Sequence, residues 1–248
     1  MRPVATMPEF GGMPRTELER LAQAGAVVEE CACAVRAAGG TIIDEMLCGQ
    51  AVFLDWNHYP EDDVYDRDSH AQYYYHAHPK AERPAEHGHF HTFLRPKGMP
   101  PRAKPTDVAG NETPPGENEA LSHLVAISMD ESGAALGLFT TNRWVTGETW
   151  YEANDVIAMI DCFRIDHGRP SRSVNRWLTA MIALFRPQIR LLLLERDETV
   201  ANWKRAKSSN SVFDDRDLEI TSHVDISVAD QMQRVRAALQ ATESGRSL

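Results

Sequence analysis

The sequence has few cysteines, no long apolar run and no basic cluster, and each absence excludes a class of protein. Its four cysteines include no pair suited to a structural zinc site, because Cys31 and Cys33 would point to different faces of one helix. The longest apolar run, Leu191 to Leu194, is far below the ~20 residues that span a bilayer. The formal net charge is −10, so we expect no nucleic-acid partner and no membrane association.

The composition is otherwise that of a globular protein. Hydrophobic residues make up 42% and charged residues 25% of the 248 residues, which favours a substantial core over general disorder. Residues 1–15 carry three prolines and a glycine pair without an apolar segment, so we expect a disordered leader, no secretory signal and a cytoplasmic location. We predict a single α+β domain over residues 16–240 and a disordered tail over residues 241–248.

Histidine is concentrated in one stretch, where seven of the ten histidines lie between His58 and His91. Residues 73–78 read Tyr-Tyr-Tyr-His-Ala-His, and residues 86–91 read Glu-His-Gly-His-Phe-His. Side chains alternate across a strand, so an antiparallel hairpin of these two segments can place the imidazoles on one face. The register that does so pairs His78 with His87, His76 with His89, and Tyr74 with His91. A slip by one residue would scatter them over both faces.

Such a patch of neutral imidazoles predicts a transition-metal site that binds Fe, Cu, Mn or Zn. The predicted ligands come from both strands and from one later apolar segment: His76, His78, Glu86, His87, His89, His91 and His123. Glu86 can bind the ion directly or orient a ligating histidine, a role also open to Glu82, Asp63, Asp66 and the three tyrosines. His58 and His70 are weaker candidates. The alternative is a structural or solvent-exposed histidine cluster.

His89-Phe90-His91 on a strand resembles the first metal motif of the cupins. The carboxylate expected shortly after that motif is absent from residues 92–98, and no glycine-rich second motif with its own histidine follows. The resemblance is confined to these three residues, so we do not extend the cupin fold or ligand set to the chain.

Hydrophobic periodicity predicts the remaining elements. Capping boxes at residues 16–19 and 149–152 indicate two helix starts, and further helices are expected over residues 173–186, 187–206 and 228–239. Two apolar segments, residues 121–130 and 134–141, predict a second hairpin. Short strands are expected over residues 51–56 and 218–222, and a loop over residues 56–66, which are rich in turn formers. The order favours an α+β fold: an antiparallel sheet of short strands carries the His-rich hairpin and packs with an N-terminal helix and three to four C-terminal helices.

Residues 95–119 form the longest segment without apolar periodicity. They contain six prolines and three glycines. A loop of this length inside a domain is usually either disordered or a lid. Both alternatives stay open, and the lid is of interest because the loop leaves directly from the second histidine strand.

Three residues are candidates for catalytic roles. Arg143 can bind a substrate carboxylate or phosphate through two hydrogen bonds. Glu148 can act as a general base, and Tyr74, beside the predicted metal, can donate a proton. The structural alternatives are a turn before a helix for Arg143, a favourable contact with the helix N-terminus for Glu148, and strand packing for Tyr74.

These features predict a metal-dependent enzyme, first an oxidoreductase with a His-ligated Fe or Cu centre acting on a small, anionic substrate, and second a metal-assisted hydrolase. A non-catalytic metal or haem binder, such as a carrier, sensor or assembly factor, is the main alternative, because the histidines outnumber the ligands of one mononuclear site. A scaffold whose histidines tune a response to pH is the third hypothesis.

Overall fold

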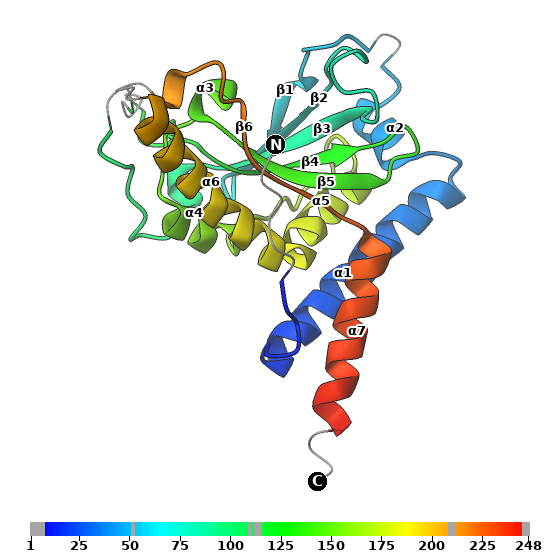
Figure 1. Ribbon diagram of the computed structural model, residues 1–248. Helices are drawn as coiled ribbons and strands as arrows, with labels where there is room; N and C mark the ends of the chain where they lie inside the picture. Colours follow the sequence, from blue (N-terminus) through cyan, green and yellow to red (C-terminus); the bar gives the residue numbers. More distant parts are fainter. Residues whose placement is uncertain (1–7, 51–52, 109–110, 112–115, 208–211, 245–248) are drawn as a thin grey trace.

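The chain folds around a six-stranded antiparallel sheet, which the computed structural model describes over residues 8–50, 53–108, 111, 116–207 and 212–244 (Figure 1). The strands follow one another in chain order across the sheet: β1 (Tyr59–Tyr65), β2 (Ala71–His76), β3 (Gly88–Leu94), β4 (Ser122–Met129), β5 (Ala135–Thr141) and β6 (Ile220–Asp225). The helices are α1 (Arg15–Ala37), α2 (Ile42–Leu47), α3 (Arg143–Thr146), α4 (Ala153–Ile160), α5 (Arg172–Leu184), α6 (Arg186–Lys207) and α7 (Val228–Ser244), with 3₁₀ turns at Pro96–Gly98 and Val212–Asp214. The predicted α+β fold is confirmed.

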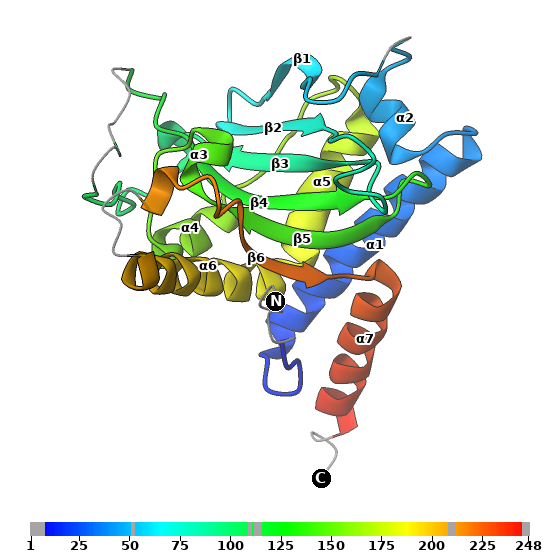
Figure 2. The ribbon, with the colours of Figure 1, turned by 45° about the horizontal axis from the view of Figure 1, so that its top comes forward.

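Helices cover one face of this sheet. Figures 1 and 2 show α4, α5 and α6 on that face, while α1 lies against α5 and α7 lies against α1. The short helices α2 and α3 lie near opposite ends of the strands (Figure 2). The sheet therefore has one helix-covered face and one face without a long helix.

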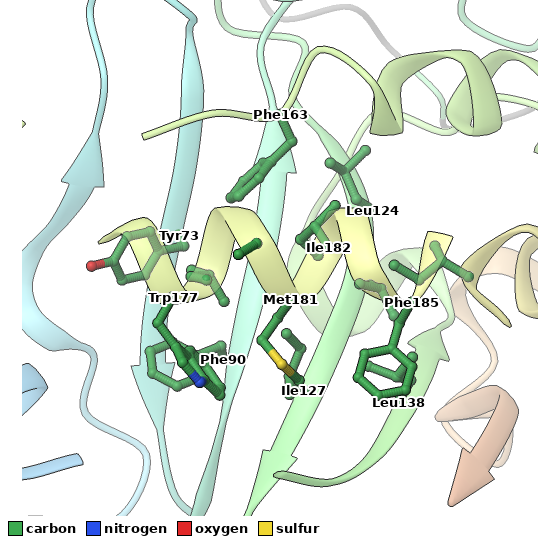
Figure 3. Packing of buried hydrophobic residues seen from close by; sticks show 14 of the residues in the cluster. Tyr73, Phe90, Leu124, Ile127, Leu138, Phe163, Trp177, Met181, Ile182 and Phe185 are labelled. Carbon is green, nitrogen blue, oxygen red and sulfur yellow. The ribbon is translucent and has the colours of Figure 1, made fainter. Parts of the chain in front are cut away.

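The core lies between the sheet and α5. Alternate strand residues point toward the helix, among them Tyr73, Phe90 and Ile127, and each is fully buried (Figure 3). Trp177 and Met181 of α5 pack against them (Figure 3). Burying one large apolar side chain contributes about 1.5–3 kcal/mol, so this face supplies much of the folding free energy. The intervening strand residues, which include the histidines, point to the other face.

No single helix among the described residues has the length and apolar character needed to cross a membrane. The pair α5 and α6, bent by 69° at the break between them, passes the same test by length and composition alone.

The predicted loop over residues 56–66 is wrong for most of its length, because Tyr59–Tyr65 form strand β1. β1 pairs with β2 through Tyr59 with Tyr75 and Val64 with Tyr73, and the register shifts between these pairs. The shift accommodates Pro60 and the acidic residues on an edge strand, where a missing N–H donor is tolerated. The predicted strand over residues 51–56 does not form at residues 53–56, and residues 51–52 lie outside the described part of the chain.

Both predicted capping boxes are wrong. Helix α1 begins at Arg15 after Pro14, and α4 begins at Ala153 after Glu152, in each case without a side-chain cap hydrogen bond. A capping box does form at Thr41 and Asp44 before α2. Thr149, Trp150 and Tyr151 are instead buried ahead of α4, because tertiary packing overrides the local signal.

The ends of the predicted domain are more ordered than expected. Phe10 is buried against Leu18, Leu21 and Val235, so the prediction of disorder is wrong for residues 8–15, while residues 1–7 lie outside the described chain. Helix α7 continues to Ser244, four residues into the predicted tail, and residues 245–248 are again outside.

The described residues of the 95–119 loop make fixed contacts. Arg95 Nε donates to Gln72 at 2.7 Å, and Asn118 donates to the Tyr65 hydroxyl at 2.9 Å. Thr106 donates its backbone N–H to Trp150 at 2.9 Å. The disordered alternative is therefore wrong for this part of the loop, and the lid role stays a prediction.

Candidate metal centre

The β2–β3 hairpin adopts the predicted register where its strands are formed. Tyr74 pairs with His91, and His76 pairs with His89. The third predicted pair falls outside the strands, because β2 ends at His76 and β3 begins at Gly88. The hairpin lies near the β1 edge of the sheet (Figure 2).

Three histidines from these strands converge on one point. His76, His89 and His91 each offer a ring nitrogen, and these nitrogens all lie within 4.8 Å of one another. Nε2 of His76 is 2.7 Å from Nε2 of His89. A tetrahedral ion with metal–nitrogen bonds of 2.0–2.1 Å needs ligand nitrogens about 3.3 Å apart, so this pair has to separate by only about 0.6 Å. The triad is therefore close to a ligating arrangement.

Further histidines surround the triad. The His78 ring centroid lies 5.2 Å from that of His76 and 5.3 Å from that of His89. His91 Nδ1 lies 3.0 Å from His123 Nε2, and the His58 ring lies 5.9 Å from that of His76. We call this set the histidine cluster: His58, His76, His78, His89, His91 and His123. It includes His78 and His123, as predicted, and the weaker candidate His58.

Carboxylates hold the Nδ1 atoms of three cluster histidines. Asp63 lies 3.0 Å from Nδ1 of His58, and Glu82 lies 3.3 Å from Nδ1 of His78. Glu86 binds Nδ1 of His89. A carboxylate at Nδ1 fixes the orientation and tautomer of a histidine whose Nε2 binds a metal. Glu82 and Asp63 therefore lie where orienting residues would, and their orienting role stays a prediction. Asp66 instead binds backbone N–H groups of residues 68, 69 and 166.

Glu86 is itself held by two neighbours. Its second carboxylate oxygen lies 3.3 Å from an Arg83 guanidinium nitrogen and 3.3 Å from the Ser128 hydroxyl. With both oxygens engaged, Glu86 fits the orienting role better than that of a direct ligand.

The hydrogen bonds define the tautomers of His76 and His89. His89 donates from Nδ1 to the Glu86 carboxylate, so its Nε2 is an acceptor. His76 must then carry its proton on Nε2 to donate to His89. An ion bound by both Nε2 atoms would require the proton of His76 to be on Nδ1 instead. Metal binding by these two histidines would therefore need no net proton release.

Burial favours the neutral form of four cluster histidines: His76, His89, His91 and His123. Desolvation, reinforced by the neighbouring histidines, lowers the pKa of His76 to about 2 and the pKa of His91 well below its ordinary value. Desolvation also lowers the pKa of His123 to about 3 and that of His89 to about 4, although the Glu86 carboxylate opposes the shift at His89. Neutral imidazoles have the lone pair that a metal needs.

His87 lies on the opposite face, and its predicted ligand role is wrong. Its Nδ1 is 2.8 Å from the hydroxyl of Tyr75, whose side chain points toward the helices, and its ring stacks on Phe53. The chain bends at His87, so strand alternation does not extend to it. Gly88 follows the bend, and a Cβ there would lie 2.6 Å from the His76 carbonyl oxygen. A glycine at this position therefore allows the close approach of the β2 backbone.

Two of the three predicted catalytic residues adjoin the cluster. The Tyr74 ring stacks on His58 with centroids 3.6 Å apart and lies 5.1 Å from His91, and burial raises its pKa. Glu148 accepts the backbone N–H of His123 at 2.7 Å. Its other oxygen is buried without a hydrogen-bond partner in the described chain, and desolvation raises its pKa to about 7. A carboxyl group in this state can exchange protons near neutral pH.

Arg143 is engaged elsewhere. Its guanidinium lies 2.7 Å from Asp214 and packs over the Phe213 ring at 5.3 Å. Its predicted role in binding an anionic substrate therefore has no support from the geometry, because the carboxylate of Asp214 already takes the place of that anion.

A cavity of about 560 Å³, which we call the side cavity, adjoins the cluster. Its lining includes His78, Arg83, Glu86, Phe139, Glu219 and His223. The sequence analysis did not single out Arg83. Its position between Glu82 and Glu86, in the link from β2 to β3, was the feature that could have drawn attention to it. The side cavity gives small molecules a place beside the triad.

Comparison with known proteins identifies a family but no characterised relative. No curated protein and no solved structure matches the chain. A protein-family model described as "Domain of unknown function (DUF6969)" matches residues 22–226. The match spans most of the chain and includes all six strands, the histidine cluster and the side cavity. The chain therefore belongs to the DUF6969 family.

Proposed function

We propose that the protein is a metal-dependent enzyme, an oxidoreductase that uses a His-ligated Fe or Cu ion. The observation that carries this proposal is the convergence of His76, His89 and His91, with ligand nitrogens within 4.8 Å of one another. Three neutral imidazoles would fill part of the coordination shell of such an ion and would leave a position for water, dioxygen or substrate. A closed structural site would fill that position with a fourth protein ligand.

The surrounding residues supply the remaining functions of such a site. Glu86 orients His89. The Tyr74 hydroxyl serves as a proton donor, and Glu148 serves as a proton acceptor because its pKa is raised to about 7. The bound ion supplies redox or Lewis-acid chemistry. The substrate is a small molecule that enters through the side cavity.

Metal-assisted hydrolysis is the second candidate reaction. Three histidines are also a ligand set of catalytic zinc, and a zinc-bound water can be ionised near neutral pH. Mn fits the same nitrogen ligands. Metal identity therefore decides between the two reactions.

A non-catalytic metal or haem binder is the alternative function. The six contacting histidines of the cluster favour it, because they exceed the three or four ligands of one mononuclear centre. In a carrier or sensor, the extra imidazoles would let an ion move between neighbouring positions.

Elemental analysis of protein purified without added metal tests the proposal. We expect stoichiometric Fe or Cu in the wild type and its loss in the double variant His89→Ala, His91→Ala. His87→Gln is the matched control, because His87 belongs to the same hairpin but faces the helices, and it should retain the metal. Protein that holds no ion after purification, and takes none from Fe, Cu, Mn or Zn salts, would contradict both the enzyme and the carrier.

A second measurement separates these two functions. An oxidoreductase consumes dioxygen in the presence of a reductant and keeps its ion bound. A carrier transfers its ion to a chelator of moderate affinity and shows no turnover.

A further inference from the structure

We propose that the side cavity binds a small organic cation, an amine with an apolar body, and that this is the substrate class of the metal centre. That the amine is a substrate depends on the proposed function. That the cavity binds an amine depends only on the cavity itself.

The cavity has the size and floor of a small-molecule site. Its volume of about 560 Å³ falls within the range of about 300–1,000 Å³ typical of ligand pockets. Leu136, Gly137, Phe139 and Ile220 line it on the side of the sheet. Gly137 keeps this floor open, since a Cβ there would lie 3.0 Å from His223 Nε2. An apolar body therefore has a surface on which to pack.

One end of this floor reaches the metal centre. The Phe139 ring lies 5.1 Å from the His89 ring, and both His78 and Glu86 line the cavity. A ligand on the floor is thus separated from the triad only by side chains that contact it.

The charge of the lining favours a cation. Four carboxylates face the cavity, from Glu82, Glu86, Glu219 and Asp225, against the single guanidinium of Arg83. The four carboxylates and one guanidinium give these side chains a formal charge of −3. Like charges in a confined space raise the local concentration of counter-ions, so the wall attracts an ammonium group and repels a carboxylate.

Arg83 does not offset this preference, because its guanidinium is already bound. One nitrogen lies 2.8 Å from Glu219, another lies 3.3 Å from Glu86, and the group packs over the Phe139 ring at 5.1 Å. An incoming anion would have to displace Glu219 from Arg83. An incoming ammonium can instead use the carboxylate oxygens that Arg83 leaves open.

Calorimetric titration of the metal-free protein with three probes tests the proposal. Benzylamine, benzyl alcohol and benzoate share one ring and differ in charge. We expect benzylamine to bind most tightly, benzoate most weakly, and only the benzylamine affinity to fall as salt is raised. Equal or tighter binding of benzoate would overturn the proposal.

Two variants locate the effect in the cavity. Glu219→Gln removes a rim carboxylate and leaves Arg83 with Glu86 as its one remaining carboxylate partner in the lining, so benzylamine affinity should fall about two- to fivefold while benzoate affinity rises. Asp225→Asn should weaken benzylamine only. Glu29→Gln, which changes an exposed carboxylate on α1, is the matched control and should alter neither. Unchanged probe selectivity in folded Glu219→Gln protein would refute the assignment.

The same titration separates this proposal from the enzyme. If benzylamine binds selectively but the protein takes up no metal, the cavity site stands and the enzyme is refuted. If the metal binds but the amine does not, the substrate class alone is refuted.

Discussion

We expect replacement of Glu86 to weaken the candidate metal centre while leaving the three converging histidines in place. In the wild type, its carboxylate accepts a hydrogen bond from His89 Nδ1 and contacts Arg83 and Ser128. Glu86→Gln keeps an acceptor for Nδ1 but loses the negative charge. Glu86→Ala loses both, and leaves the His89 ring free to rotate. The two variants therefore divide the contribution of Glu86 into charge and orientation.

The size of each effect follows from these contacts. Loss of a residue that orients a metal-binding histidine lowers metal affinity by about 10- to 100-fold, or about 1.4–2.7 kcal/mol. We expect Glu86→Gln near the lower bound, because the amide oxygen still holds the ring. Glu86→Ala should lie near the upper bound. In both variants Arg83 keeps its charge near the ion but has lost one of its two carboxylate partners, which adds repulsion.

Competition with a chromophoric chelator measures the dissociation constants of zinc and copper at one pH and salt concentration. Glu131→Gln is the matched control: Glu131 is an exposed carboxylate paired with Lys80 at the turn before β5, and its loss should leave metal affinity unchanged. Thermal unfolding without metal shows whether each variant is folded before its affinity is compared.

Two results would refute this account of Glu86. Wild-type affinity in Glu86→Ala would mean that the carboxylate does not orient a ligand. Equal, very large losses in both Glu86 variants would mean that Glu86 is itself a ligand, since a neutral amide would then fail as completely as alanine.

Three further predictions concern stability. Because the buried histidines have lowered folded-state pKa values, the unfolded chain binds more protons below pH ~6.5. The free energy of unfolding, measured in urea, should therefore fall as the pH is lowered below about 6.5. Each such histidine contributes a loss of about 1.4 kcal/mol per pH unit, and for His89 this loss stops at about pH 4. Gly88→Ala should lower stability by about 1–3 kcal/mol through a backbone clash, whereas Gly168→Ala, which meets nothing within 4 Å, should not. Tyr73→Phe removes a buried 2.5 Å bond to Asn175 and should cost about 1–3 kcal/mol in thermal unfolding, with metal content unchanged.

The sequence was sufficient for the face and register of the triad, because these depend on the parity of residues in one hairpin. Tyr74 opposite His91 and His76 opposite His89 follow once both segments are strands. The same arithmetic failed at His87, where a bend before Gly88 interrupts the alternation. Strand parity can be counted in a sequence, but the point at which a strand stops depends on its neighbours.

Strand β1 could not be predicted from its composition. Tyr59 to Asp63 contains a proline and three acidic residues, which are typical of a turn. At the edge of a sheet such residues are tolerated, and a register shift accommodates them. The error had a consequence for the site, because β1 brings Asp63 to His58 and His58 onto the Tyr74 ring.

The roles of the arginines depended on partners far away in the chain. Arg143 is bound to Asp214, 71 residues later, and Arg83 to Glu219, 136 residues later. Local sequence made Arg143 a plausible substrate ligand and gave Arg83 no particular role. The long-range ion pairs give the opposite result. Arg143 is bound to Asp214 and engaged there, whereas Arg83 lines the cavity beside the histidine cluster.

Two of the four non-glycine residues with positive φ angles in the described chain contact the histidine cluster. Trp56 and Asp63 have positive φ angles of 70° and 55°, which cost roughly 1–3 kcal/mol each in residues other than glycine. Each nevertheless places a side chain against a cluster histidine: the Trp56 ring lies 4.1 Å from that of His78, and Asp63 bonds to His58. A face needed only as core would be filled by apolar side chains, as the helix-covered face is. Strain and desolvated imidazoles on one face are what a ligand site requires, which is the physical reason for assigning the function to this face.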